Sequence, residues 1–439
     1  MATIRPRIPD SEFAQRAKNV QALMKEQNID ALLAFGNEAE PQFARYLCDY
    51  WPSFESCGVL LAQEGDPVLL IGPESMTFAS DRSRVKDIRR LAAFRESSNP
   101  EYPGHKLETV ADVLDGMLGS SGCHRFAIAG YNLIPHITYV ELATALERFG
   151  QVEICRGDEL MMSLRMVKSE NEIACLRYAG MLTAKAFDYV LENIRPGMTE
   201  LQVRGLACAA MYEAGAENES YPMWILAGDG GNQAISRARH KAIEKNDFVH
   251  LQIGARYEGY ASTIGRPVFF GKTEQYLVDA VKVGYEAHTA VLSQLYAGNN
   301  AANVAKAHLD VMRRNGYEDW LLYGPCHGTG LMEGEAPWIE SDSDYILKEK
   351  NPFRIFVYAD EASKLKRCME RQPADETLTE REMKKQMAAL DRRRAQYYSY
   401  FSDQKWGARE NYDLMLNTSG RDIKKTAAAL AEYLKGEIE

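Results

Sequence analysis

A histidine in a glycine-rich segment is the residue of this 439-residue chain that is best suited to chemistry. His327 lies within Cys326-His-Gly-Thr-Gly-Leu-Met-Glu-Gly-Glu335. Because an imidazole titrates near neutral pH, His327 could transfer a proton in a reaction or hydrogen-bond a substrate. The alternative is a structural histidine that hydrogen-bonds a neighbouring hairpin. A single imidazole without carboxylate partners is a poor metal site, so we expect no metal here.

Three further side chains are candidate substrate-binding residues: Arg266, Tyr260 and Asp229. Arg266 could clamp a substrate carboxylate through two parallel N–H groups, or it could pair with a carboxylate of its own domain. Tyr260 lies close to Arg266 in the sequence. Asp229 lies within Ala227-Gly-Asp-Gly-Gly231, where the alternative is that the glycines simply let the chain turn tightly.

A predicted β-hairpin positions Arg266 and Tyr260. The stretch Val249-His-Leu-Gln-Ile-Gly-Ala-Arg-Tyr-Glu-Gly-Tyr-Ala-Ser-Thr-Ile-Gly-Arg-Pro267 begins with an alternating apolar run. It continues through a turn at Tyr257-Glu258-Gly259 into a second strand. Alternation of this kind, interrupted by a glycine-containing turn, is typical of a hairpin.

This hairpin resembles the central motif of the aminopeptidase P, prolidase and creatinase superfamily, whose catalytic domain has the pita-bread fold. In that superfamily the first strand carries one metal-binding Asp, and the second carries another eleven residues later. Here the two places hold Gln252 and Thr263. Neither side chain supplies the anionic oxygen that a divalent cation requires in an oxygen-rich site. The resemblance therefore predicts the scaffold without its usual metal chemistry, and we expect no cofactor.

The resemblance also assigns positions in the glycine-rich segment. His327 falls on the superfamily's metal-binding histidine, Gly334 replaces a second, substrate-facing histidine, and Glu335 falls on the acidic residue beside it. Creatinase hydrolyses a C–N bond without metal, through a histidine upstream of the hairpin. That place holds Ile235, but His240 follows five residues later and is a candidate substrate-binding residue, with a solvated loop histidine as the alternative. His327 and Glu335 are the predicted catalytic pair.

The resemblance covers residues 12 to 345 in the expected order. An amphipathic helix over 11–24, with Ser11 as its cap, precedes strands at 31–35, 58–61, 67–71 and 125–129, as in an α/β domain. Ser169 and Glu172 form a predicted capping box where the second domain begins. Thr199 is predicted to cap the next helix.

Beyond residue 350 the chain resembles the carboxy-terminal half of a cytidylate-kinase-like protein. The matching phrases begin at Phe353-Arg-Ile-Phe-Val-Tyr and include Lys405-Trp-Gly407 and Tyr412-Asp-Leu-Met-Leu-Asn-Thr-Ser419. The superfamily's last two strands, each with a metal-binding Glu, are expected to be absent. We expect strand 354–358 to pair with the preceding sheet or with 414–417. In such kinases, arginines of the lid neutralise the transferred phosphoryl group, so the arginines of this tail could bind phosphate. The alternative is that they lie on solvent-exposed helices with many charged side chains.

Composition narrows the class of protein. With 46% hydrophobic and 26% charged residues the chain can bury sizeable cores. A net charge of −10 argues against general nucleic-acid binding, and no apolar run is long enough for a membrane span. Eight cysteines without metal-site spacing, and a start that lacks an apolar signal, favour free thiols in the cytoplasm. Phe270-Gly-Lys-Thr273 is no phosphate loop, since position 266 is Arg rather than Gly.

The predicted fold class is α/β plus α+β. A creatinase-like amino-terminal α/β domain spans 1–160, an incomplete pita-bread domain 161–345, and a short kinase-like α/β tail 346–439, joined by a gene fusion near 344–350. The predicted function is metal-independent hydrolysis of a C–N bond in a small amide, amidine or Xaa-Pro-like substrate by a cytoplasmic homodimer. The alternatives are a non-catalytic binding or scaffold protein, and nucleotide or phosphate binding through the tail.

Overall fold

The computed structural model describes residues 5–119, 122–297, 299–340, 354–370, 378–402 and 405–438. Its chain forms two compact units, Met1–Ser343 and Asp344–Glu439. The predicted joint at 344–350 lies outside the described residues.

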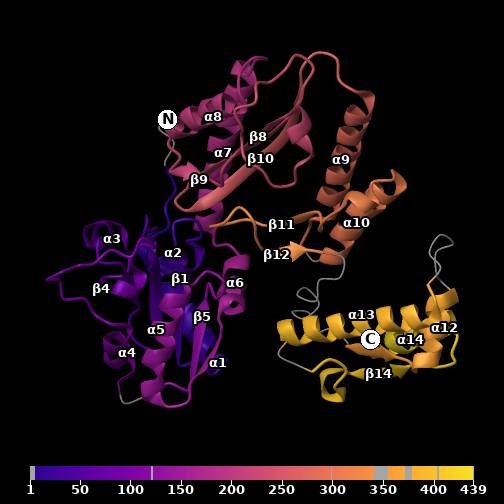
Figure 1. The fold of residues 1–439 in the computed structure, drawn as a ribbon, viewed down its shortest axis with the longest axis horizontal. Helices are drawn as coiled ribbons and strands as arrows, with labels where there is room; N and C mark the ends of the chain where they lie inside the picture. Colours follow the sequence, from indigo (N-terminus) through magenta and orange to yellow (C-terminus); the bar gives the residue numbers. More distant parts are fainter. Residues whose placement is uncertain are drawn as a thin grey trace. The chain divides into compact units, whose positions relative to one another are not determined.

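A six-stranded sheet forms the core of the amino-terminal domain, in the order β4-β3-β2-β1-β5-β6 (Figure 1). Strand β1 pairs antiparallel with β2 and parallel with β5. The strands are β1 Ala31–Gly36, β2 Cys57–Ala62, β3 Val68–Ile71, β4 Asp87–Arg90, β5 Arg125–Ala129 and β6 Glu153–Arg156. All four predicted strands are confirmed to within one residue at each end.

Helices accompany this sheet, and its central strands are buried on both faces. Along β1, Leu32 and Ala34 belong to one hydrophobic cluster while Leu33 and Phe35 belong to the other, as the period of a strand requires. The helices are α1 Asp10–Glu26, α2 Gln42–Cys48, α3 Met76–Arg82, α4 Val110–Leu118, α5 His136–Leu146 and α6 Asp158–Met166.

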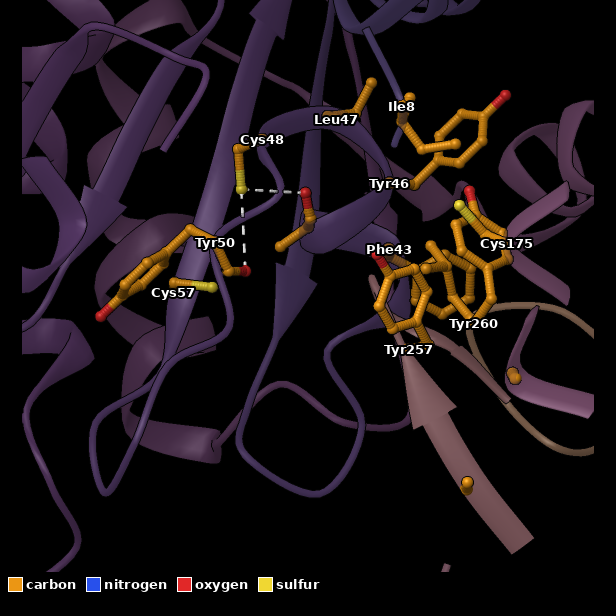
Figure 2. Packing of buried hydrophobic residues seen from close by; sticks show 14 of the residues in the cluster. Ile8, Phe43, Tyr46, Leu47, Cys48, Tyr50, Cys57, Cys175, Tyr257 and Tyr260 are labelled. Atoms are coloured by element: carbon orange, nitrogen blue, oxygen red, sulfur yellow. Dashed lines mark hydrogen bonds between the residues drawn. The ribbon is translucent and has the colours of Figure 1, made fainter. Parts of the chain in front are cut away.

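Buried thiols line part of the larger core, where Cys48 and Cys57 lie near Tyr50 (Figure 2). Cys48 hydrogen-bonds the carbonyl oxygens of Ala44 and Tyr50 at 3.1 and 3.9 Å. Burial raises the pKa of Cys48 to about 12, so this thiol stays protonated and unreactive.

The predicted cap of the first helix is wrong. The residue before α1 is Pro9, whose extended backbone (φ −73°, ψ 152°) enters the helix without a side-chain cap. Ser11 is therefore the second residue inside the helix, and it is exposed. Proline fixes the backbone geometry of the entry, and this outweighs the preference of serine for a capping position.

Two long helices and an antiparallel sheet build the second domain. The capping box predicted at Ser169 is confirmed, with Glu172 as its partner. The cap predicted at Thr199 is also confirmed, and there it forms a capping box with Gln202. Helix α7 packs across both hairpin strands. The elements are α7 Glu170–Asn193, α8 Glu200–Ala214, β7 Asn218–Glu219, β8 Trp224–Ala227, β9 Phe248–Tyr257 and β10 Tyr260–Phe269.

The predicted hairpin is confirmed as β9 and β10, paired in continuous antiparallel register. Its two-residue turn has positive φ at Glu258 (48°) and Gly259 (86°). Two consecutive left-handed residues are typical of the type I′ turn, whose twist matches that of the strands it joins.

The remainder of the first unit consists of two packed helices and a short two-stranded sheet. Helix α9 packs against α10, yet it leaves large apolar side chains exposed, among them Tyr276, Tyr285 and Leu292. The elements are α9 Gln275–Gln294, α10 Ala301–Arg314, β11 Cys326–Gly328 and β12 Glu335–Ile339.

The second unit is a small α/β fold. Strands β13 and β14 pair in parallel, which confirms one of the two predicted pairings of residues 354–358. Phe356 packs against Trp406 and Tyr412 at ring-centroid distances of 5.2 and 4.9 Å. The elements are β13 Ile355–Tyr358, α12 Glu361–Glu370, α13 Glu380–Ser402, β14 Leu414–Asn417 and α14 Ile423–Ile438. Among helices in the described ranges, none combines the length and apolar character that a bilayer crossing demands.

Candidate functional site

The hairpin presents one apolar and one polar face. Val249, Leu251 and Ile253 are fully buried in the core, so the alternate residues of β9 point to the opposite face. Gln252 lies on that opposite face, across the ladder from Gly265, and Thr263 of β10 lies across from Gly254. The two positions predicted to replace metal-binding aspartates therefore share a face.

His327 is fixed by its neighbours on the β11–β12 sheet. Its Nδ1 lies 2.8 Å from the carbonyl oxygen of Gly328. Because a carbonyl oxygen only accepts, Nδ1 carries a hydrogen, and in the neutral imidazole Nε2 is then the nitrogen with the lone pair. The ring also lies against Trp338, at 4.8 Å between centroids. A side chain at Gly334 would begin 3.4 Å from the imidazole, so glycine leaves that side of the ring uncovered.

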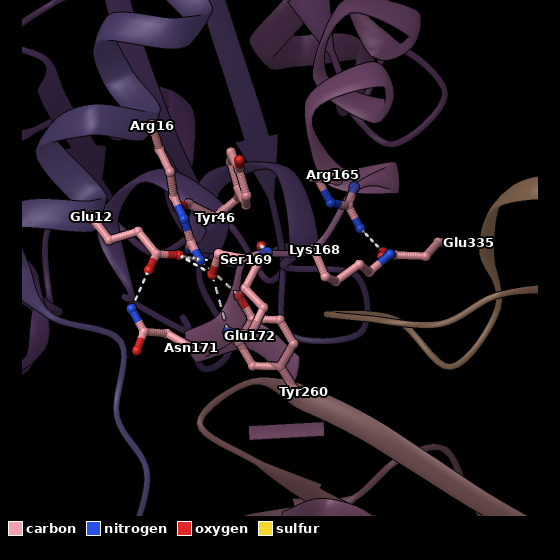
Figure 3. Close-up of polar contacts among 10 residues, drawn as sticks. All are labelled: Glu12, Arg16, Tyr46, Arg165, Lys168, Ser169, Asn171, Glu172, Tyr260 and Glu335. Atoms are coloured by element: carbon pink, nitrogen blue, oxygen red, sulfur yellow. Dashed lines mark hydrogen bonds and ion pairs between the residues drawn. The ribbon is translucent and has the colours of Figure 1, made fainter. Parts of the chain in front are cut away.

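Glu335, the other member of the predicted pair, is buried and ion-paired (Figure 3). Arg165 donates to its Oε2, and Lys168 donates to its Oε1 at 2.9 Å. Both cations come from the junction of α6 and α7, so this carboxylate anchors the glycine-rich loop to that junction. In the described part of the chain no hydrogen bond joins Glu335 to His327.

Sequence reasoning missed two residues of the polar hairpin face, His250 and Tyr221. His250 precedes Gln252 by two residues and so lies on the same face of the hairpin. The Tyr221 hydroxyl is enclosed, and its polar neighbours include Thr263 and Gln252. The alternation of strand residues could have identified His250, because residues two positions apart in a strand lie on the same face and Gln252 is two positions later.

Comparison with protein families follows the two domains of the first unit. A creatinase/prolidase N-terminal domain model matches residues 16–167, and a metallopeptidase family M24 model matches residues 174–367. Over these two stretches the chain matches the M24 metallopeptidase superfamily. A cytidylate kinase-like family model matches residues 341–420, so its match overlaps the end of the M24 match.

Individual relatives of this M24 protein are peptidases. It is 27% identical over 248 residues to an uncharacterized peptidase, YqhT, of Bacillus subtilis, covering 56% of this chain and 68% of the relative. It is 25% identical over 267 residues to an Xaa-Pro dipeptidase of Pyrococcus furiosus, covering 60% and 73%. The M24 protein therefore belongs among peptidase-type hydrolases.

Solved structures share its fold. An X-Pro aminopeptidase from Thermotoga maritima matches with a TM-score of 0.63 and 22% identity, over 75% of this chain and 85% of that one. An Xaa-Pro dipeptidase from Bacillus anthracis matches with a TM-score of 0.61 and 22% identity, over 76% and 86%. The creatinase-like amino-terminal domain and the pita-bread-type second domain are thereby confirmed.

The M24 family implies a metal centre at the hairpin, and the side chains of this chain do not fit one. Gln252 and Thr263 offer only neutral oxygens, and His327 is a single imidazole. Within the described ranges, no three His, Cys, Asp or Glu side chains are grouped so that they could hold an ion. Divalent cations in M24-type sites need several anionic ligands, which this donor set lacks.

The other predicted site residues have surroundings that differ from one another. Tyr260 is buried, where it accepts from Arg16 at 2.9 Å and donates to Glu172 at 2.8 Å (Figure 3). His240 and Arg266 are exposed, and Asp229 is 79% exposed beside Arg239 at 3.6 Å. Their substrate-binding roles remain predictions, which the buried hydrogen bonds of Tyr260 do not favour.

A cavity of about 350 Å³ lies elsewhere, in the amino-terminal domain. Phe54, Glu55 and Ser75 are among its lining residues, and none of the lining residues belongs to the hairpin or the glycine-rich loop. The Glu55 carboxylate accepts hydrogen bonds from the Glu74 N–H, at 3.1 Å, and from the Ser75 hydroxyl, so these contacts hold it in place.

Proposed function

We propose that this chain is a metal-independent hydrolase that cleaves a C–N bond in a small amide, amidine or Xaa-Pro-like substrate. The observation that carries the proposal is the state of His327. Its Nδ1–H is held by the Gly328 carbonyl, so Nε2 is the atom that can accept a proton, and it does so on an M24 scaffold. Imidazoles oriented in this way serve as general bases in hydrolysis.

In the proposed reaction His327 acts first as a general base and then as a general acid. The Nε2 atom of His327 accepts a proton from water as the water oxygen attacks the substrate carbon. The imidazolium then returns this proton to the leaving nitrogen as the C–N bond breaks. Glu335 acts by position: its pairing with Arg165 and Lys168 holds the loop that carries the imidazole.

We expect this activity to be weak. Proton transfer by a positioned side chain contributes about 10²–10⁴-fold, whereas enzymes typically achieve at least about 10⁶-fold. Developing charge on the substrate also needs a stabilising donor. Arg266, His240, Asp229 and Tyr260 are the candidates for substrate contact that the sequence offers.

Turnover in the presence of a chelator tests the proposal. Creatine-like amidines, cyclic amides and Xaa-Pro dipeptides would be screened with and without EDTA, and the dialysed protein would be analysed for metals. We expect EDTA-resistant turnover that is lost in His327→Ala and retained in His288→Ala, which removes an exposed histidine of α9. One bound Mn, Co, Zn or Fe per chain that disappears in His327→Ala would overturn the metal-free mechanism.

A second candidate is a non-catalytic binding protein of the same fold. The observation that favours it is Glu335, whose carboxylate oxygens are both occupied by Arg165 and Lys168 and so give His327 no acid partner. No turnover above a heat-killed control, together with a saturable thermal shift by one of the same compounds, would establish this alternative.

Phosphate binding through the tail has less support. Arg367 donates to the hydroxyl and carbonyl oxygens of Thr418, so this lid-type arginine already has partners within its own unit. We retain the cytoplasmic homodimer as part of the main proposal, and sedimentation of the purified chain measures its oligomeric state.

A further inference from the structure

The cavity of the amino-terminal domain is lined by aromatic rings and by carboxylates. Its volume of about 350 Å³ lies within the range of small-molecule pockets, about 300–1,000 Å³. Phe54 and Phe78 line it and are 82% and 42% exposed, so a ligand can reach both side chains from solvent. Glu55, Glu74 and Glu96 also line it, and the lining includes no Lys, Arg or His. Apolar and negatively charged groups therefore border the same space.

The elements that carry the two phenylalanines are fixed by their own contacts. The backbone N–H of Phe54 donates to Glu38 Oε2 at 3.1 Å, and Trp51 Nε1 donates to the carbonyl oxygen of Glu38 at 2.8 Å. Phe78 belongs to α3, and its ring packs edge-on against Tyr50 at 5.4 Å between centroids. A ligand would therefore order little of the protein on binding, which favours affinity.

Glu55 is a buried carboxylate without a counter-charge. It is 3% exposed, and it accepts from the Glu74 N–H at 3.1 Å and from the Ser75 hydroxyl. Both donors are neutral, and no ion pair involves Glu55 in the described ranges. A carboxylate has about four acceptor positions, of which these contacts occupy only part. Because burial of a carboxylate without a cation is unfavourable, a cation that entered the cavity would be stabilised beside it.

The other two carboxylates of the lining are also oriented by neutral donors. The Tyr102 hydroxyl donates to Glu74 Oε1 at 3.0 Å, and the Ser98 hydroxyl donates to Glu96. Neither carboxylate has an ion pair in the part of the chain that the structure describes. In that same part, no three His, Cys, Asp or Glu side chains converge closely enough to hold a metal ion. The negative charge is instead spread over the lining, which suits an organic cation with several N–H donors.

We propose that this cavity binds the primary ammonium group of a small organic amine. An ammonium carries one positive charge and three N–H donors, which match a group of carboxylates that lacks cations. The hydrocarbon part of the amine contacts Phe54 and Phe78, and an ammonium near an aromatic face gains cation–π attraction. The inference does not depend on hydrolysis at His327, because no lining residue belongs to the hairpin or the glycine-rich loop.

Three molecules of similar size and different charge test the proposal: butylammonium, 1-butanol and butanoate. Ligand-observed NMR titration of the full-length protein gives a dissociation constant for each. We expect butylammonium to bind at least roughly tenfold more tightly than the other two, and Glu55→Gln to weaken it roughly tenfold or more, the value of a hydrogen bond between charged groups. Glu96→Gln changes a half-buried residue and so is less disruptive to folding. It should weaken butylammonium roughly two- to fivefold.

Glu26→Gln is the matched control, since Glu26 is an exposed glutamate at the end of α1 in the same domain and does not line the cavity. It removes the same charge and should leave butylammonium binding unchanged. Equal or tighter binding of butanol or butanoate, no binding of butylammonium, or unchanged binding in folded Glu55→Gln or Glu96→Gln would overturn the proposal. Displacement of butylammonium by one equivalent of calcium would also overturn it, because the carboxylates would then bind a metal ion.

Discussion

At the scale of single residues, His327 and Glu335 stand close in sequence yet have opposite surroundings. The imidazole is partly exposed and its Nδ1 contacts the Gly328 carbonyl oxygen, whereas the carboxylate is buried between two cations. The first environment suits proton transfer, and the second suits mechanical support. Substitution of His327 should therefore affect activity, whereas substitution of Glu335 should affect stability.

Glu335→Gln is expected to destabilise the fold. Removing one partner of a buried ion pair costs about 3–5 kcal/mol, because Arg165 and Lys168 would be left without their counter-charge. The free energy of unfolding from urea titration measures this, with Glu318→Gln in an exposed pair with Arg313 as the control that should show no change. If Glu335→Gln kept full stability but abolished turnover, Glu335 would be catalytic instead.

At the scale of elements, the hairpin turn is tied to the amino-terminal domain. Arg45 of α2 pairs with Glu217 at 2.8 Å, and Glu217 also accepts from the Gly259 N–H at 2.8 Å. Arg256 beside the turn donates to the carbonyl oxygens of Gly259, Ser220 and Leu331. These contacts fix the glycine-rich loop against the end of the hairpin.

Replacing the turn glycine should show how tightly this end is packed. A Cβ on Gly259 would lie 2.6 Å from Leu331 Cδ2 and 3.0 Å from Arg45 Nε, on a backbone with φ 86°. We expect Gly259→Ala to lower the free energy of unfolding by roughly 2–5 kcal/mol, from left-handed strain plus overpacking. Gly65→Ala is the matched control, with φ 88° and open space around it, and should lose only about 1–2 kcal/mol. Equal losses in denaturant titrations would contradict the packing argument.

The Arg45–Glu217 ion pair should make the free energy of unfolding depend on pH in the acidic range. Burial tends to raise the pKa of Glu217, but Arg45 and the Gly259 N–H outweigh it and lower the pKa below its ordinary value of 4.5. A carboxylate with a lowered pKa stabilises the fold above its ordinary pKa and loses that contribution as pH falls through the folded value. Unfolding measured below pH 4.5 should therefore depend less steeply on pH in Glu217→Gln than in the wild type. Identical slopes would show that Glu217 is not linked to folding.

Local signals in the sequence predicted several helices and strands, whereas contacts between residues far apart in the sequence were not predicted. The capping boxes at Ser169 and Thr199 need only four consecutive residues, so they were readable. The pairing of Glu335 with Arg165 joins residues 170 positions apart, and no local sequence pattern near either residue predicts it. His250 lay between these cases, since strand period placed it beside Gln252 but only packing revealed its neutral surroundings.

At the scale of the whole molecule, the chain forms two compact units. In the second, Phe356 packs between Trp406 and Tyr412, and its ring lies 3.0 Å from where a Cβ of Gly407 would be. Because Phe356 is only half-buried, Phe356→Ala should lower local stability by less than the about 3–5 kcal/mol that truncating a fully buried Phe costs. Hydrogen exchange on the full chain should lose protection in β13 and β14 while β9 and β10 keep theirs. Loss of protection in the hairpin as well would mean that the two units unfold together.

Exposed apolar side chains on α9 have a consequence for the protein in solution. Tyr276 and Tyr285 are 67% and 73% exposed, and Leu292 is 54% exposed on the same helix, so copies of the chain can attract one another through apolar contact. The net charge of −10 opposes this attraction at long range. Added salt shortens the reach of the repulsion to about 8 Å at physiological ionic strength. Colloidal stability should therefore fall as salt rises, and light scattering would record clustering that dilution into low-salt buffer reverses.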